Sequence, residues 1–176
     1  MTIGRTGGAE QVAVPVAIQA ELLAKVASYD RRLVERAEGH VHVLVVTRIG
    51  NDDSARAATQ LITALRPLTD IGTMPHDEAI VGYTSAEALA QLCRARRVSI
   101  VYVTPGLGED IEALRVALTS VDVLSVGAVA DYVPRGMVLG FDLTSGKPKL
   151  LVNLAQARKQ GVAFRADVLK MMRVYE

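Results

Sequence analysis

Gly136-Met-Val-Leu-Gly-Phe-Asp-Leu-Thr-Ser-Gly-Lys-Pro-Lys-Leu-Leu-Val-Asn-Leu-Ala-Gln-Ala-Arg-Lys-Gln-Gly161 is the stretch whose pattern decides the fold. Met137–Leu143 is apolar and rich in strand-forming residues, and Lys149–Val152 is a second strand-like run. Between them, Thr144–Lys147 contains Gly146, which can adopt the positive φ that a tight turn requires. The stretch therefore predicts a β-hairpin.

A short helix is predicted directly after the hairpin. Asn153 has a side chain suited to cap a helix start, and Gly161 stands where a left-handed residue commonly ends a helix. The helix should therefore cover Leu154–Gln160, and a final helix rich in leucine is expected after Gly161.

The chain upstream of the hairpin alternates between strand and helix patterns. Buried strands are predicted at Val41–Thr47, Val98–Val103 and Val121–Val126, and a short strand at Ala79–Tyr83. Helices are predicted at Val16–Glu38, Ser54–Leu65, Ser85–Arg96 and Glu109–Leu118. This alternation predicts a single three-layer α/β/α domain with a mostly parallel sheet and the C-terminal hairpin at its edge.

Composition limits the class of protein. The chain has 176 residues, of which 50% are hydrophobic and 22% charged, and its formal net charge is +1. This predicts one globular domain at residues 12–176, preceded by a flexible tail at residues 1–11. The near-neutral charge argues against a nucleic-acid binder, and no apolar run is long enough to span a membrane. Met1–Ala9 lacks the pattern of a secretory signal, so we expect either a cytoplasmic protein or one whose signal is absent from this chain.

Cys93 is the only cysteine, so no intramolecular disulfide can form. It stands in a helical pattern beside Leu89 and Leu92. This context favours a small buried thiol over a reactive one.

Thr104-Pro-Gly-Leu-Gly108 follows a predicted strand and precedes a helix, which is where α/β folds bind phosphates. The loop lacks the Gly-x-Gly-x-x-Gly pattern and the Lys-Ser/Thr of a P-loop. Glu109 and Asp110 would also repel a phosphate. A plain turn is the favoured interpretation, and contacts of Thr104, Gly106 and Gly108 with a small ligand are the alternative.

Asp52 and Asp53 follow the first predicted strand, as the acidic pair of a receiver domain does. The later strands supply no lone Asp at the phosphoacceptor position, because the relevant strand ends in Thr104. We therefore interpret Asp52 and Asp53 as helix-capping residues. Thr84 with Glu87 is interpreted as a capping box for the third helix.

His40 and His42 alternate at the start of a strand and so share one face. Together with His76-Asp77-Glu78 they could ligate a metal, but nothing in the sequence fixes the distance between the two segments. Exposed histidines at a strand end are the favoured interpretation, and no metal is predicted. The common motifs of hydrolases, zinc proteases and redox enzymes are lacking, so no catalytic residue is predicted.

The C-terminal part of the chain is basic. Between Arg135 and Glu176 eight Lys/Arg residues stand against three Asp/Glu residues. This region could form a basic face that meets an acidic partner, or simply the solvated side of amphipathic helices.

The hairpin, the strand ending in Asn153-Leu154, the following short helix and the final helix resemble the C-terminal half of the YfiR family. Val123–Gly127 is similar to a strand of that family, and Gln19–Asp30 resembles its first helix. The resemblance covers roughly residues 12–176 and is clearest over residues 98–174. The single cysteine departs from this family, whose members often carry disulfides.

This resemblance implies a non-enzymatic regulator in the periplasm. It would bind and inhibit the sensor domain of a membrane diguanylate cyclase, lowering cyclic di-GMP and biofilm formation, and would itself bind neither cyclic di-GMP nor a cofactor. A homodimer is also implied. We predict partner contacts near the hairpin and the last helix, from whichever apolar or amphipathic residues are exposed, with a basic rim. The candidates are Met137, Phe141, Phe164, Met171 and Tyr175, with Lys147, Lys149 and Arg158 as the rim.

Two other functions stay open at this point. The chain could be a small-molecule-binding module that resembles a periplasmic binding domain, using the loops at 47–51, 104–108 and 127–130. A deep pocket at the carboxyl ends of the strands would distinguish this function. The other is a hydrolase or transferase, which would need a nucleophile and a base converging in that pocket.

Overall fold

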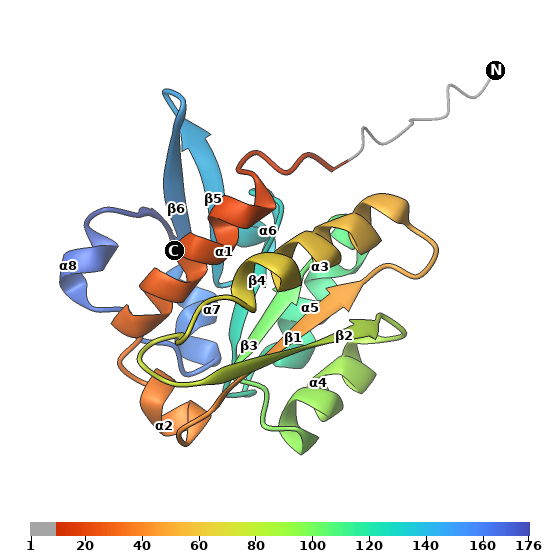
Figure 1. Ribbon diagram of the computed structural model, residues 1–176, viewed down its shortest axis with the longest axis horizontal. Helices are drawn as coiled ribbons and strands as arrows, with labels where there is room; N and C mark the ends of the chain where they lie inside the picture. Colours follow the sequence, from red (N-terminus) through yellow and green to blue (C-terminus); the bar gives the residue numbers. More distant parts are fainter. Residues whose placement is uncertain (1–9) are drawn as a thin grey trace.

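A twisted sheet runs through the centre of the computed structural model, which describes residues 10–176 (Figure 1). Residues 1–9 of the predicted tail lie outside the described residues. Within residues 10–176 the sheet has seven strands in the order β2-β1-β3-β4-β5-β6-β7. Their bounds are β1 Val41–Thr47, β2 His76–Gly82, β3 Ile100–Val103, β4 Leu124–Gly127, β5 Leu139–Thr144, β6 Lys147–Asn153 and β7 Arg173–Tyr175. All neighbouring pairs are parallel except β5 and β6.

Helices cover both faces of the sheet, as predicted. The helices are α1 Val16–Val26, α2 Leu33–Ala37, α3 Asp52–Leu65, α4 Ala86–Ala95, α5 Ile111–Leu118, α6 Tyr132–Arg135, α7 Leu154–Lys159 and α8 Ala166–Leu169. Two 3-10 turns lie at Ala27–Tyr29 and Gly108–Asp110. Helices α1 and α3 pack on one face, against Val43 and Val45 of β1, and α4 and α5 pack on the other, against Leu44 and Val46. The continuous apolar run of β1 is therefore explained by burial on both of its faces.

The predicted hairpin is confirmed as β5 and β6, and Gly146 in its turn has φ of +76°. The hairpin is not at the edge of the sheet, however, because β7 pairs in parallel with the end of β6. The predicted final helix is α8, which covers only Ala166–Leu169 because the chain then continues into β7. Arg173 extends from β7 to Asp142 of β5 at 3.1 Å.

The first predicted helix, Val16–Glu38, is interrupted at Asp30. The carboxylate of Asp30 accepts hydrogen bonds from the backbone N–H groups of Arg32 and Ala163, both at 3.1 Å, and pairs with Arg36 at 2.7 Å. Asp30 also forms a β-bridge with Phe164. These bonds require an extended backbone at Asp30, with φ −79° and ψ 110°, so the helix ends before it.

Side-chain caps begin three of the helices. Asn153 caps α7 as predicted, accepting a hydrogen bond from Gln156 N at 3.0 Å. Asn51 caps α3, which places Asp52 and Asp53 in its first turn, and Ser85 caps α4 in place of Thr84. The predicted caps of α3 and α4 were one or two residues away from the observed ones, because several neighbouring side chains suit the same position. Gly161 has the predicted left-handed conformation, with φ of +68°.

Replacing Gly146 by Val should lower the free energy of unfolding by about 1 kcal/mol, because a β-branched side chain is strained at positive φ. No atom lies within 4 Å of the position that a Cβ would take, so crowding adds nothing. Urea unfolding followed by circular dichroism measures the change. Gly146→Asn is the matched control and should cost less, since Asn tolerates this conformation. Equal losses for Val and Asn would contradict a conformational cause.

Replacing Asp30 by Ala should destabilise the protein by about 3 kcal/mol or more, because the buried Arg36 loses the acceptor of its Nη1 and keeps only its pair with the half-exposed Asp122. The side chains of Asp30 and Arg36 are 0% and 2% exposed. The control is Arg56→Ala, which removes an exposed pair with Asp53 and should cost less than about 1 kcal/mol. Similar unfolding midpoints for the two variants would show that the buried pair contributes little.

Candidate functional site

Three of the predicted partner-contact residues are buried. Met137 and Phe141 are fully buried, and Phe164 is 7% exposed. Phe141 and Phe164 pack into the core beside α1, and Met137 packs into the core on the opposite face of the sheet. These three side chains are therefore not available at the surface, because Phe141 lies on an inner strand and Met137 and Phe164 pack into the core on either side of the sheet.

The other five predicted residues remain at the surface. Lys147 and Arg158 are exposed, Lys149 and Tyr175 are half-buried, and Met171 is 61% exposed. Lys147 and Lys149 alternate along β6, and Tyr175 is paired in register with Asn153 of the same strand. Lys147, Lys149 and Tyr175 therefore point to one face of the sheet. We call Lys147, Lys149, Arg158, Met171 and Tyr175 the hairpin surface.

Two apolar residues near the hairpin surface were not predicted. Leu143 of β5 is 44% exposed and Val174 of β7 is 39% exposed. Their register with β6 places them on the face opposite to Lys149. Figure 1 shows the turn of the hairpin extending beyond the rest of the sheet, so both of its faces are accessible there. The polar residues at the end of β5 indicated that part of this strand is exposed. Only the tertiary structure shows that exposure begins near Leu143.

The basic rim has no acidic partner within residues 10–176. Lys147, Lys149 and Arg158 form none of the salt bridges in this part of the structure, whereas Asp142 nearby is paired with Arg173. The three positive charges are therefore available to a negatively charged surface.

The loop Thr104–Gly108 is held by the protein itself. The Thr104 hydroxyl donates to Val46 O at 2.7 Å and lies 2.6 Å from Ser54 Oγ. Gly106 N donates to the carboxylate of Glu10 at 2.6 Å, and Gly106 O accepts from Arg48 Nε at 2.9 Å. The polar groups predicted to meet a ligand thus already have intramolecular partners.

Glu10 was expected in a flexible tail but is held between the loops at the carboxyl ends of β3 and β4. Its carboxylate accepts hydrogen bonds from Gly106 N and from the hydroxyl of Tyr132. Burial and the neighbouring Glu10 raise the pKa of Tyr132 above its ordinary value, so this hydroxyl stays protonated. A Cβ at Gly108 would meet an oxygen of Glu10, so a larger residue there would displace this carboxylate. No local sequence pattern indicated this contact, since it joins residues about a hundred positions apart.

A groove of about 660 Å³ lies beside this contact, between α1 and α3. Glu10 and Pro105 border it at the carboxyl end of β3, and Asp53, Arg56 and Gln60 of α3 supply polar groups. Its volume falls within the range of small-molecule sites. A groove large enough for a small molecule therefore lies next to the loop Thr104–Gly108, although Gly106 N of that loop binds Glu10 instead.

Cys93 is buried, as predicted. Its exposed fraction is 2%, and burial raises the pKa of the thiol to about 12. The thiol is therefore protonated at neutral pH and is a poor nucleophile.

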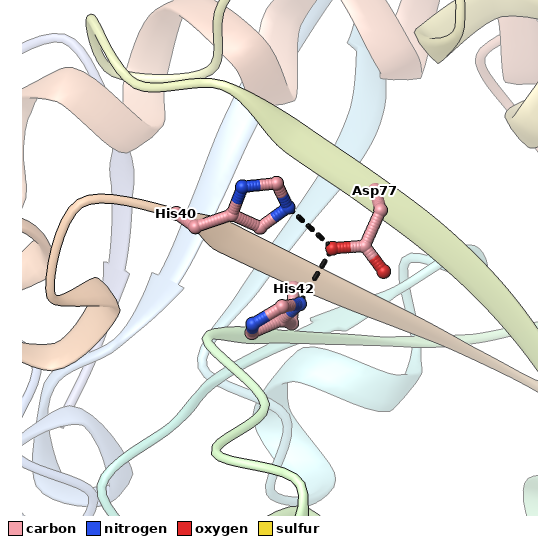
Figure 2. A group of neighbouring side chains, drawn as sticks. All are labelled: His40, His42 and Asp77. Carbon is pink, nitrogen blue, oxygen red and sulfur yellow. Dashed lines mark hydrogen bonds and ion pairs between the residues drawn. The ribbon is translucent and has the colours of Figure 1, made fainter.

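His40, His42 and Asp77 meet at the amino-terminal ends of β1 and β2 (Figure 2). His40 Nε2 lies 2.6 Å from Asp77 Oδ1, and His42 Nδ1 lies 2.5 Å from the same oxygen. The third histidine, His76, is separate and bonds to Leu68 O and Glu78. The sequence showed the alternation of the two histidines, but the parallel register of His42 with Asp77 brings the carboxylate to them.

Comparison with known proteins identifies a family and a fold. The family model described as YfiR/HmsC-like matches residues 17–173. No curated protein sequence matches the chain. None of the helices in residues 10–176 has the length and apolarity needed to cross a bilayer.

Three solved structures share the fold. A conserved domain protein from Vibrio cholerae O1 biovar El Tor superimposes with a TM-score of 0.63 at 16% identity, over 92% of this chain and 60% of that one. A domain crystallised with L-tryptophan from a Streptococcus species gives 0.56 at 11% identity, over 86% and 62%. A ligand-free substrate-binding protein with adhesive properties from Clostridium difficile gives 0.52 at 13% identity, over 82% and 57%. The present chain thus spans about 60% of the length of these structures, and the similarity concerns the fold alone.

Replacing Glu10 by Ala should release the backbone N–H of Gly106. We expect this amide to exchange its hydrogen about tenfold faster or more, because its buried acceptor is lost. Hydrogen exchange followed by mass spectrometry or NMR measures the rate. Glu21→Ala, at an exposed position of α1, is the control and should leave this amide unchanged. Unaltered exchange at Gly106 in Glu10→Ala would contradict a role for Glu10 in holding the loop.

Proposed function

The chain belongs to the YfiR/HmsC-like family, and from this membership we propose that it is a non-enzymatic periplasmic regulator of a membrane diguanylate cyclase. It binds the sensor domain of the cyclase and holds the enzyme inactive, which lowers cyclic di-GMP and biofilm formation. The observation that carries this proposal is the family match across residues 17–173. A homodimer belongs to the same proposal.

The described residues offer structural support for a role without catalysis. The hydroxyls of Ser54, Thr104 and Tyr132 at the carboxyl ends of the strands are engaged in buried hydrogen bonds. The thiol of Cys93 is buried and protonated at neutral pH. These groups therefore stabilise the loops and the core, and a binding function agrees with their arrangement.

A regulator of this kind works by binding one state of its target more tightly than the other. To shift a cyclase from an even equilibrium to 99:1 in favour of the inactive state, it must prefer that state by roughly 100-fold, or about 2.7 kcal/mol. A few side chains buried on binding supply a difference of this size. No conformational change within the regulator itself is required.

We assign the contact to the hairpin surface. Met171 is a large exposed apolar side chain, and the half-buried Tyr175 carries both an apolar ring and a polar tip. Residues of these two types are common at the centres of interfaces. Lys147, Lys149 and Arg158 supply the positive charges of this surface, and such charges accelerate association with an acidic partner.

A second candidate function is the binding of a small molecule in the groove between α1 and α3. Its volume of about 660 Å³ favours this candidate, as does its place at the carboxyl end of β3. Arg56 and Asp53 would orient polar groups of the ligand. Binding of small amino and organic acids that is lost in Arg56→Ala but kept in the hairpin-surface variant below would support it.

Reversing the charges of the rim, with Lys147, Lys149 and Arg158 all changed to Glu, should slow association with the cyclase sensor domain about tenfold or more at low salt. The salt dependence of the association rate should fall, because the steering charges are lost. Surface plasmon resonance at several ionic strengths measures both effects. The melting temperature should change little, since the three residues make no salt bridges within residues 10–176.

The matched control reverses three exposed arginines at the ends of α3 and α4, away from the hairpin surface, namely Arg66, Arg94 and Arg96. This control changes the net charge by the same amount, so it distinguishes a loss of charge at the hairpin surface from a change in the net charge of the protein. If both triple variants associate equally slowly, the hairpin surface is not the interface. The same conclusion follows if the rim variant associates at the wild-type rate.

A further inference from the structure

Two imidazoles and one carboxylate converge at the edge of the sheet that is farthest from the hairpin surface. We propose that His40, His42 and Asp77 bind one divalent transition-metal ion, for which zinc is the probe. All three candidate ligand atoms lie within 4.8 Å of one another. Figure 2 shows both rings turned toward the same carboxylate oxygen.

The backbone fixes the three positions independently of any metal. His40 follows a tight turn in which Glu38 and Gly39 have φ of +50° and +91°, and its N–H donates to Ala37 O at 3.1 Å. His42 is two residues further along, so both histidines project from the same face of β1. Asp77 is the residue of β2 that pairs in register with His42. The cluster thus depends on rigid elements that the core holds in place.

The distances need only a small adjustment to admit a metal. His40 Nε2 and His42 Nδ1 lie 2.6 Å and 2.5 Å from Asp77 Oδ1, as two N–H donors sharing one acceptor. In a tetrahedral zinc site with bonds of 2.0–2.1 Å, the ligand atoms stand about 3.3 Å apart. Each nitrogen-to-oxygen distance must therefore increase by about 0.8 Å, and the protons on His40 Nε2 and His42 Nδ1 must be displaced by the metal. Side chains that are 42%, 42% and 54% exposed have room for this movement.

The ligand set selects the class of metal. Imidazole nitrogens suit zinc, copper and nickel, whereas calcium and magnesium prefer oxygen ligands alone. Three protein ligands leave at least one coordination position, and the exposure of all three side chains places water there. The metal would join β1 to β2. In the sheet formed by residues 10–176, β2 is an edge strand. Binding should therefore raise the stability of this edge.

Isothermal titration of the full chain, freed of metal with a chelator, should show one zinc ion bound per chain. Cobalt(II) in place of zinc should give the intense visible absorption of a tetrahedral site. The melting temperature should rise by about 5 to 11 °C when zinc exceeds its Kd by 100-fold. An absence of zinc binding at 100 µM would overturn the proposal, as would a ratio of one zinc per two chains.

Substitutions identify the ligands. His42→Gln and Asp77→Asn should each weaken zinc binding by about 100-fold. Mutating a residue that only orients a metal ligand already lowers metal affinity by about 10- to 100-fold. Asp77→Asn keeps the size of the side chain and an oxygen acceptor, so the fold of the strand is preserved. The control is His76→Gln, which alters the remaining histidine, whose side chain is 4% exposed, and should leave zinc affinity unchanged.

The pattern of results decides the proposal independently of the regulator function, because the cyclase is not part of the assay. Full zinc affinity in both His42→Gln and Asp77→Asn would overturn the site. Loss of affinity in His76→Gln alone would assign the metal to His76 and Glu78 and would also overturn it. Circular dichroism of each metal-free variant verifies that the affinities are compared between folded proteins.

Discussion

The buried ion pair between Asp30 and Arg36 joins the segment after α1 to the C-terminal segment around Gly161 and Ala163. Asp30 ends the first helical segment and binds the C-terminal segment through Ala163 N at 3.1 Å. Arg36 donates to Gly161 O at 2.9 Å and pairs with Asp122, also at 2.9 Å. Every charged or polar atom of this pair has a partner, which is the condition under which a buried pair is tolerated. The break in the first helix and the path of the last segment both follow from it.

The opposite end of the sheet is closed by the N-terminal segment. The hydroxyl of Tyr102 donates a hydrogen bond to Gln19 Oε1 at 2.7 Å. Gln19 Nε2 in turn donates to Val14 O and Ala128 O, both at 3.0 Å. Glu10 completes this closure at Gly106. In an α/β fold this is the end of the sheet where ligands usually bind. The intramolecular contacts there agree with a protein that acts through its surface, and they leave the groove between α1 and α3 as the place for a small molecule.

The proposed partner site and the proposed metal site lie at opposite edges of the sheet. The hairpin surface is formed by β6, β7, α7 and the turn before β7, whereas the histidine cluster lies on β1, β2 and the residue before β1. Strands β3 and β4, which lie between them, are fully buried, and the two sites share no side chain. A metal at the β2 edge and a partner at the β7 edge could therefore be bound at the same time, and each can be altered by substitution without disturbing the other.

The sequence by itself determined the α/β class, the hairpin with Gly146, the cap at Asn153 and the burial of Cys93, because these depend on local periodicity and backbone preference. It also carried the family resemblance. Only the tertiary structure decided which hydrophobic residues face solvent, since Phe141 and Met171 are equally apolar in the sequence but lie on an inner strand and in an exposed turn. The sheet order, the β7 edge, the contact of Glu10 with Gly106 and the meeting of His42 with Asp77 all join distant residues. Their partners are fixed by packing and strand register, which a local pattern does not encode.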